Sequence, residues 1–157
     1  MKITFLGAAH EVTGSCYLLE TTSTKSGQAI TTRILIDCGM FQGSNFNEGK
    51  NHEVFPFDAS MIDAVLVTHP HLDHVGRIPK LVREGFSGHI YMTKAACELA
   101  KLIWDDAFSI MSYNHKKFQE PILFDATDIA AAQSVSRGVD YHDSVEIGDV
   151  KATWYDA

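Results

Sequence analysis

Three histidines and an aspartate lie within six consecutive residues of this chain, in the segment His69-Pro70-His71-Leu72-Asp73-His74. For a chain of this composition, a chance match to the pattern His-x-His-x-Asp-His is expected in about one case in a thousand. Imidazole nitrogens and carboxylate oxygens are protein donors that suit Zn²⁺. Because a loop that leaves a strand can turn alternate side chains toward one point, we expect His69 and His71 to share one metal ion.

The second half of this motif predicts a second ion. Asp73 and His74 follow where the loop enters a helix, so they would face a neighbouring position and serve an ion a few ångströms from the first. Two ions held in this way lower the pKa of a bridging water and stabilise charge on the oxygen under attack. We therefore expect hydrolysis by a metal-bound hydroxide. A surface metal trap, a pH-sensing patch and a solvated loop are the alternative interpretations of the same histidines.

Buried strands precede these polar residues. The β-branched run 30–36 predicts a strand that ends at Asp37, and the run 64–68 predicts another that ends at the histidine motif. We expect Asp37 to orient the metal-bearing loop by hydrogen bonds, with a turn cap as its alternative role. Asp37 and Asp73 are the two residues that we assign to catalysis.

Other residues with possible chemistry have simpler explanations. Cys38 is expected to be a small buried hydrophobe rather than a metal ligand. His10 and His52 lie in polar loops, where each is either a surface histidine or part of a substrate cleft. Two further sets fit ordinary helix positions: the solvated helix end Lys116 and Lys117, and the core-facing stripe Trp104, Phe108 and Met111.

The remaining pattern is that of a mixed α/β domain without repeats or an internal linker. Further strands are predicted at 2–6, 16–20 and 89–92, helices at 77–84, 94–111 and 125–136, and a hairpin at 145–154. Thr93 is the expected N-cap of the second helix, and Arg137-Gly138 the basic last turn and C-cap glycine of the third. Residues 40–60 form a long connection, and connections of this length are often functional.

Composition excludes several classes of protein. The 157 residues are 45% apolar and 21% charged, which suits one globular domain. Thirteen Lys and Arg against 20 Asp and Glu give a net charge of -7, which argues against this chain alone being a general binder of phosphate backbones. No apolar run approaches the roughly 18 residues of a membrane helix, and no secretory leader is completed. Three widely spaced cysteines fit a reducing cytoplasm.

The histidine motif resembles the signature of the metallo-β-lactamase fold, a superfamily of mostly dinuclear zinc hydrolases. Its surroundings are similar to the RNA-processing β-CASP branch, which includes the polyadenylation-factor nuclease and related bacterial and archaeal ribonucleases. The segments that carry this similarity are Gly14-Ser15-Cys16-Tyr17-Leu18-Leu19, Ile36-Asp37-Cys38-Gly39-Met40-Phe41-Gln42-Gly43 and Leu72-Asp73-His74-Val75-Gly76-Arg77-Ile78-Pro79. The resemblance implies an α/β (α+β) fold, a metallo-β-lactamase-like αββα sandwich, of which residues 1–157 would be the amino-terminal part.

The resemblance also implies roles for the site residues. His69 and His71 would hold the first zinc, Asp73 and His74 the second, and Asp37 would be the motif-one aspartate that supports them. Mn²⁺ is an alternative metal. The reaction would be hydrolysis of RNA phosphodiester bonds. Pro70 stands where the family more often has a small residue.

Four side chains cannot complete two metal shells that also hold a hydroxide. In the family, the next ligand histidine follows a strand and a glycine, and the bridging aspartate, later histidines and inserted β-CASP domain come after it. We therefore expect residues 1–157 by themselves to bind metal weakly and to turn over little, with RNA bound largely through the missing portion.

Three hypotheses stay open at this point. The first is the amino-terminal part of a zinc-dependent ribonuclease, whose general acid lies outside residues 1–157. The second is another hydrolase of the same fold, acting on a thioester, a lactone or a β-lactam. The third is a non-catalytic module, or a subunit that a partner chain completes. Oligomeric state is left undetermined.

Overall fold

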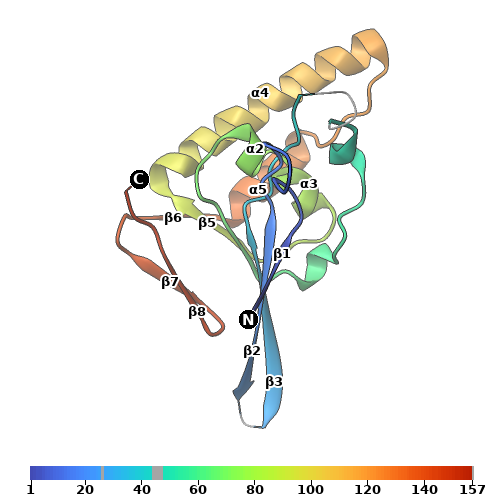
Figure 1. Cartoon of the computed structure of the whole chain (residues 1–157). Coiled ribbons are helices and arrows are strands. Elements are labelled where there is room, and N and C mark those ends of the chain that lie inside the picture. Colours follow the sequence, from blue (N-terminus) through green and yellow to red (C-terminus); the bar gives the residue numbers. More distant parts are fainter. Residues whose placement is uncertain (26, 44–47, 157) are drawn as a thin grey trace.

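A six-stranded sheet forms the framework of the protein (Figure 1). The computed structural model describes residues 1–25, 27–43 and 48–156. The strands follow chain order across the sheet, antiparallel from β1 to β3 and parallel from β3 to β6. They are β1 (Lys2–Phe5), β2 (Tyr17–Lys25), β3 (Gln28–Ile36), β4 (Ala64–Leu66), β5 (His89–Thr93) and β6 (Ser136–Val139).

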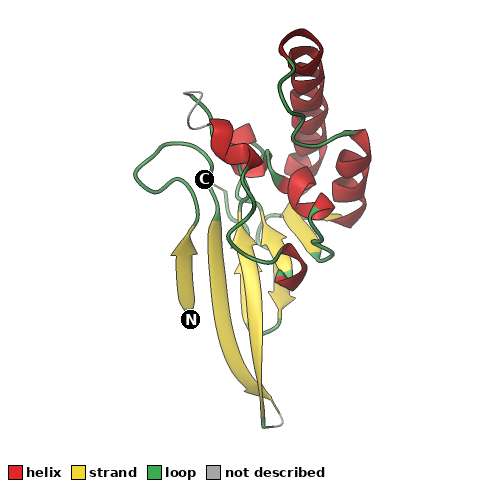
Figure 2. Ribbon diagram, turned by 90° about the vertical axis from the view of Figure 1, so that its right-hand side faces the viewer, coloured by secondary structure: helices red, strands yellow, loops and turns green. Residues whose placement is uncertain are grey.

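Helices gather on one side of this sheet (Figure 2). The α-helices are α2 (Leu72–Val75), α3 (Ile78–Arg83), α4 (Lys94–Phe118) and α5 (Ala126–Val135), and the short 3-10 helices are η1 (Lys50–His52) and η2 (Ala59–Met61). Leu35, Val65 and Ile90 lie side by side on β3, β4 and β5 and are fully buried. They share one hydrophobic core with Trp104 of α4. This core places the carboxyl ends of β3 and β4 next to the amino end of α2.

A second, two-stranded sheet packs on the main sheet. It consists of the antiparallel strands β7 (Ser144–Ile147) and β8 (Val150–Thr153). Thr21 Oγ1 donates to Asp149 Oδ1 at 2.6 Å, and Trp154 Nε1 donates to the Val67 carbonyl at 2.9 Å. The turn residue Gly148 has φ 63° and passes so close to Thr32 that a Cβ would come within 2.1 Å of Oγ1. The predicted hairpin is confirmed.

Most predicted elements are confirmed with small shifts at their ends. Thr93 is the N-cap of α4, and its side chain accepts a hydrogen bond from the Ala96 amide at 3.3 Å. The helix continues past Met111 to Phe118 and ends at Gln119, which adopts the left-handed conformation. Trp104 is buried and Phe108 packs against the core, as the apolar stripe predicts. No helix within the described ranges is long and apolar enough to cross a membrane.

The predicted end of the third helix is wrong. Arg137 and Gly138 do not form a last helical turn with a C-cap glycine, because α5 ends at Val135 and both residues belong to β6. Arg137 pairs with Tyr91 and Gly138 with Met92 on β5. Gly138 is also needed for close packing, since a Cβ there would come within 2.9 Å of the Lys94 side chain. Pairing with a strand distant in the sequence outweighs the local helix-ending pattern.

Candidate metal centre

Two parallel strands bring the chemical residues to one edge of the sheet. Ile36 at the end of β3 pairs with Leu66 at the end of β4, and the Asp37 amide donates to the Leu66 carbonyl at 2.9 Å. Asp37 has φ 59°, a left-handed conformation that aspartate tolerates better than most residues. The turn directs the carboxylate toward the loop that follows β4. Asp37 and Thr68 therefore meet although 31 positions separate them.

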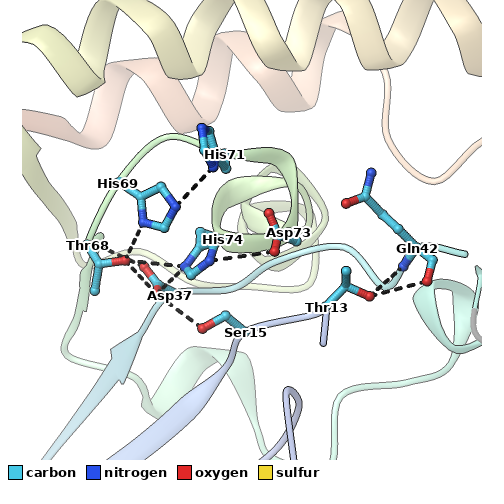
Figure 3. Close-up of polar contacts among 9 residues, drawn as sticks. All are labelled: Thr13, Ser15, Asp37, Gln42, Thr68, His69, His71, Asp73 and His74. Carbon is cyan, nitrogen blue, oxygen red and sulfur yellow. Dashed lines mark hydrogen bonds and ion pairs between the residues drawn. The ribbon is translucent and has the colours of Figure 1, made fainter. Parts of the chain in front are cut away.

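The buried Asp37 carboxylate is the centre of a hydrogen-bond network, drawn in Figure 3. Its exposed fraction is 1%. Oδ1 accepts from the Thr68 amide at 2.8 Å, and Oδ2 lies 2.8 Å from Thr68 Oγ1, 2.8 Å from His74 Nδ1 and 3.2 Å from Ser15 Oγ. A carboxylate at pH 7 only accepts, so each of these partners must donate its proton to it. His74 then carries its proton on Nδ1 and keeps a lone pair on Nε2.

The same logic fixes the ring of His69. The only hydroxyl proton of Thr68 goes to Asp37, so Thr68 Oγ1 is left to accept from His69 Nδ1 at 3.1 Å. His69 Nε2 consequently keeps a lone pair. This nitrogen lies 3.2 Å from His71 Nδ1. Burial, followed by the nearby rings of His74 and His71, lowers the pKa of His69 and favours the neutral imidazole.

The donor atoms form two pairs. Two nitrogens bound at about 2.0–2.1 Å to one tetrahedral zinc lie about 3.3 Å apart, which the 3.2 Å between His69 Nε2 and His71 Nδ1 matches. The second pair is Asp73 Oδ2 and His74 Nε2, 3.6 Å apart. Within residues 1–25, 27–43 and 48–156, no group of three or more His, Cys, Asp or Glu side chains is arranged to hold an ion. The nitrogen and oxygen donors fit zinc as two pairs.

Backbone hydrogen bonds hold the short helix α2 in place. The carbonyls of Leu72, Asp73 and His74 accept from the amides of Met40, Ser15 and Cys38 at 3.0, 2.8 and 2.8 Å. Gly39 makes this contact possible, because a Cβ there would stand 1.6 Å from the Asp73 carbonyl oxygen. Segments that precede β2 and follow β3 thus grip the helix that carries Asp73 and His74.

A buried arginine fastens the same corner. Arg77 has an exposed fraction of 5%, and its Nε donates to the Gly39 carbonyl at 2.5 Å. The guanidinium lies 4.6 Å from the centre of the Phe41 ring and 5.4 Å from that of Phe55. The hydrogen bond and the cation–π contacts compensate this buried charge for the loss of its hydration. From the opposite side, Trp104 Nε1 donates to the Val75 carbonyl at 2.9 Å.

The structure brings five of the predicted site residues together: Asp37, His69, His71, Asp73 and His74. His10 is exposed and lies outside this group. His52 lines a neighbouring cavity of about 520 Å³ together with Leu72. Cys38 is fully buried within the core, which confirms its predicted role as a small hydrophobe.

Sequence reasoning missed three residues of the site. Ser15 and Thr68 bind the Asp37 carboxylate, and Arg77 supports the turn behind it. Thr68 directly precedes the histidine motif and follows a predicted strand, a position at which a hydroxyl can reach the next strand end. Ser15 and Arg77 lie in the segments that carried the family resemblance, but their residue types alone indicate no partner.

Comparison with known proteins identifies the family. A profile of the metallo-beta-lactamase superfamily matches residues 11–149. The chain belongs to the metallo-β-lactamase superfamily. The mixed α/β fold predicted from the sequence is confirmed by this match. Solved structures agree: a metallo-β-lactamase from Cronobacter sakazakii has a TM-score of 0.53 at 18% identity, covering 95% of this chain and 48% of that one. GOB-18 from Elizabethkingia meningoseptica has a TM-score of 0.51 at 19% identity, covering 96% and 46%.

The curated relatives of this superfamily member include RNA-cleaving enzymes. The chain is 43% identical over 148 residues to "Ribonuclease TTHA0252" of Thermus thermophilus, covering 94% of this chain and 30% of the relative. It is 35% identical over 161 residues to "Transcription termination factor FttA" of Methanosarcina mazei, covering 100% and 23%. It is 29% identical over 155 residues to "Endoribonuclease ysh1" of Schizosaccharomyces pombe, covering 97% and 18%.

These relatives confirm the resemblance to RNA-processing nucleases of the β-CASP type. The chain spans less than a third of the length of each of the three.

Proposed function

We propose that residues 1–157 contribute part of the active site of a zinc-dependent ribonuclease. In this proposal His69 and His71 hold one zinc, and Asp73 and His74 hold the second. The observation that carries it is the 3.2 Å approach of His69 Nε2 to His71 Nδ1, because the hydrogen bonds behind His69 leave its metal-facing nitrogen unprotonated. RNA as substrate is supported by the relative named ribonuclease, at 43% identity.

Zinc bound at these pairs would supply Lewis-acid activation of water and of the phosphodiester near neutral pH. The residues of this chain would then have separate tasks. Asp37 keeps the proton of His74 on Nδ1 and, through Thr68, that of His69 on Nδ1 as well. Asp73 would contribute a carboxylate oxygen to the second ion, next to His74 Nε2. The general acid for the leaving oxygen is proposed to come from outside residues 1–157, and Mn²⁺ is the alternative ion.

Two other functions can be distinguished from RNA cleavage by experiment: hydrolysis of a different substrate by the same fold, and a non-catalytic role. A thioester, lactone or β-lactam hydrolase would use the same donors, but the similarity to the two β-lactamase structures named above lies at 18–19% identity and concerns the fold alone. A non-catalytic or partner-completed module would keep the hydrogen-bond network without turnover. The names of the relatives favour RNA over both.

The test is a substrate panel on the full-length protein, with zinc content measured in parallel. The panel contains single-stranded RNA, a β-lactam, a thioester and a lactone. We expect RNA cleavage by the wild type, and a loss of more than about a hundredfold with lower zinc content in H69A and H71A. H89A is the matched control, since His89 is an exposed histidine on β5. Undiminished RNA cleavage by H69A, or turnover of only the β-lactam, would refute the proposal.

A further inference from the structure

A cavity of about 480 Å³ separates the histidine motif from helix α4. His71 and Asp73 line it on one side, so an occupant would touch two of the proposed metal donors. The other residues around it are Gln42, Leu72, Leu99, Leu102, Ile103, Asp106, Ala107 and Ile110. This volume lies within the range of small-molecule sites and accommodates one nucleotide unit.

The wall on α4 is apolar and open to solvent. Leu99, Leu102 and Ile110 are 49%, 63% and 55% exposed. Their spacing places them on one stripe of the helix, and Asp106 interrupts that stripe. A contiguous row of exposed aliphatic side chains is typical of a ligand-binding or protein-binding surface. A protein segment seated here would also cover His71 and Asp73 and close the reaction centre, which favours the substrate itself as the occupant.

The charges indicate how a nucleotide would lie. A phosphate next to the Asp106 carboxylate would be repelled, whereas the proposed metal pairs attract it. The phosphate therefore belongs at the motif and the base at α4, where its flat face meets aliphatic side chains. Within the described residues the Asp106 side chain makes no hydrogen bond or ion pair, so both oxygens are available to accept. A carboxylate accepts from the amino groups of cytosine and adenine. Uracil has no amino group, and its single N3–H donor is flanked by two carbonyl oxygens that repel a carboxylate.

Gln42 stands at the remaining side of the cavity. Its backbone is fixed by Thr13, whose Oγ1 accepts from the Gln42 amide at 2.9 Å and lies 3.3 Å from the Gln42 carbonyl. The side-chain amide makes no hydrogen bond among the described residues, and Figure 3 shows it extending away from this backbone contact. It offers both a donor and an acceptor to a base edge.

We propose that this cavity is a nucleobase subsite, in which Asp106 selects cytosine or adenine over uracil next to the cleaved phosphodiester. The inference rests on the proposed ribonuclease function and extends it to a base preference.

The test uses the full-length protein and three fluorescein-labelled octaribonucleotides, r(C)8, r(A)8 and r(U)8. Binding is measured by anisotropy with zinc present, on cleavage-resistant analogues of the three oligonucleotides, and cleavage is measured on the RNAs themselves. We expect r(C)8 and r(A)8 to bind between about fivefold and a hundredfold more tightly than r(U)8. D106N should bring this ratio close to one. D105N is the matched control, since Asp105 neighbours Asp106 on α4 but does not line the cavity, and it should keep the wild-type ratio.

A second variant tests the apolar wall. L102A should weaken all three oligonucleotides by about fivefold without changing their ratio. A D106N ratio equal to that of the wild type, in a protein that cleaves RNA, overturns this inference and leaves the proposed function standing. A wild type that neither binds nor cleaves any of the RNAs removes the proposed function itself. An L102A variant with unchanged RNA binding and a lowered melting temperature would show that protein covers the cavity, which also overturns the inference.

Discussion

Two surfaces face each other across the cavity beside His71. On one side, the polar groups around Asp37 and the histidine motif bind one another. The Asp37 carboxylate by itself accepts hydrogen bonds from Ser15, Thr68 and His74. On the other side, α4 presents the aliphatic side chains of Leu99, Leu102 and Ile110 to solvent. Between them lies the Asp106 carboxylate, which has no hydrogen-bond or ion-pair partner within the described residues. The hydrogen-bonding groups of the first surface are mostly satisfied within the protein, and they fix the orientation of the side chains. The groups of the second surface are available to bind a ligand.

This difference predicts that substitutions around Asp37 and the histidine motif lower the free energy of unfolding and the zinc affinity together. Substitutions on the exposed face of α4 are expected to change only ligand binding. The largest effect is expected for D37A. Removing the carboxylate leaves the Thr68 amide and the His74 Nδ1 proton, which are only partly shielded from water, without their acceptor. We expect a loss of about 3 kcal/mol in the free energy of unfolding and of about 10–100-fold in zinc affinity. Urea unfolding and zinc competition with a chelator measure both.

D63A is the control for D37A. Asp63 is exposed and accepts one backbone hydrogen bond, from the Arg33 amide at 2.7 Å. Its loss should cost about 1 kcal/mol and leave zinc affinity unchanged. Equal zinc affinities of D37A and the wild type would contradict the role given to Asp37.

A smaller effect is expected where the loop touches α2. G39A introduces a methyl group against the Asp73 carbonyl, a backbone atom that cannot move aside as a side chain would. We expect destabilisation by about 2–3 kcal/mol and lower zinc content, since Asp73 must shift. G49A is matched to it, because a Cβ at Gly49 meets nothing within 4 Å. Similar melting temperatures of the two variants would argue against this contact.

Loss of the arginine behind the turn should follow. R77M leaves the Gly39 carbonyl without its donor and removes the cation from Phe41, for about 2 kcal/mol in urea unfolding. R83M changes the same residue type at the end of α3, where the guanidinium is 3.5 Å from Asp128 and its side chain is 45% exposed. This exposed pair should contribute no more than about 0.5 kcal/mol. The comparison fails if both variants unfold alike.

The smallest effect is expected on the facing wall. Because Leu99 is half exposed on α4, L99S should change the free energy of unfolding by less than about 0.5 kcal/mol and leave zinc content unaltered. Thermal unfolding and metal analysis of the same sample check this. A loss comparable to that of R77M would show that the wall contributes to the stability of the fold as much as the loop does.

The strands that position the site could be predicted because each is encoded by a short run of apolar, β-branched residues. The β-branched runs before Asp37 and Thr68 become β3 and β4, and the polar residues follow at the strand ends. The four proposed metal donors are adjacent in sequence, so their grouping is visible without a structure. The order of strands across the sheet does not follow from such local patterns, and it was not predicted from the sequence.

Long-range partners account for what could not be predicted. Ser15, Thr68 and Arg77 bind groups 22, 31 and 38 positions away, and their residue types are common in any loop or helix. The end of α5 was misplaced for the same reason, since Arg137 and Gly138 pair with β5 rather than with their own neighbours. Side-chain spacing reports which residues share a face, but not which distant face they meet.

The grip on α2 also bears on how the protein folds. Amides of Ser15, Cys38 and Met40 must all reach the carbonyls of this four-residue helix before Asp73 and His74 are held in place. A helix of that length does not persist by itself in water. The motif therefore acquires its shape late, after the chain has closed loops of several dozen residues, and a peptide restricted to 64–85 would carry every donor without the geometry to use them.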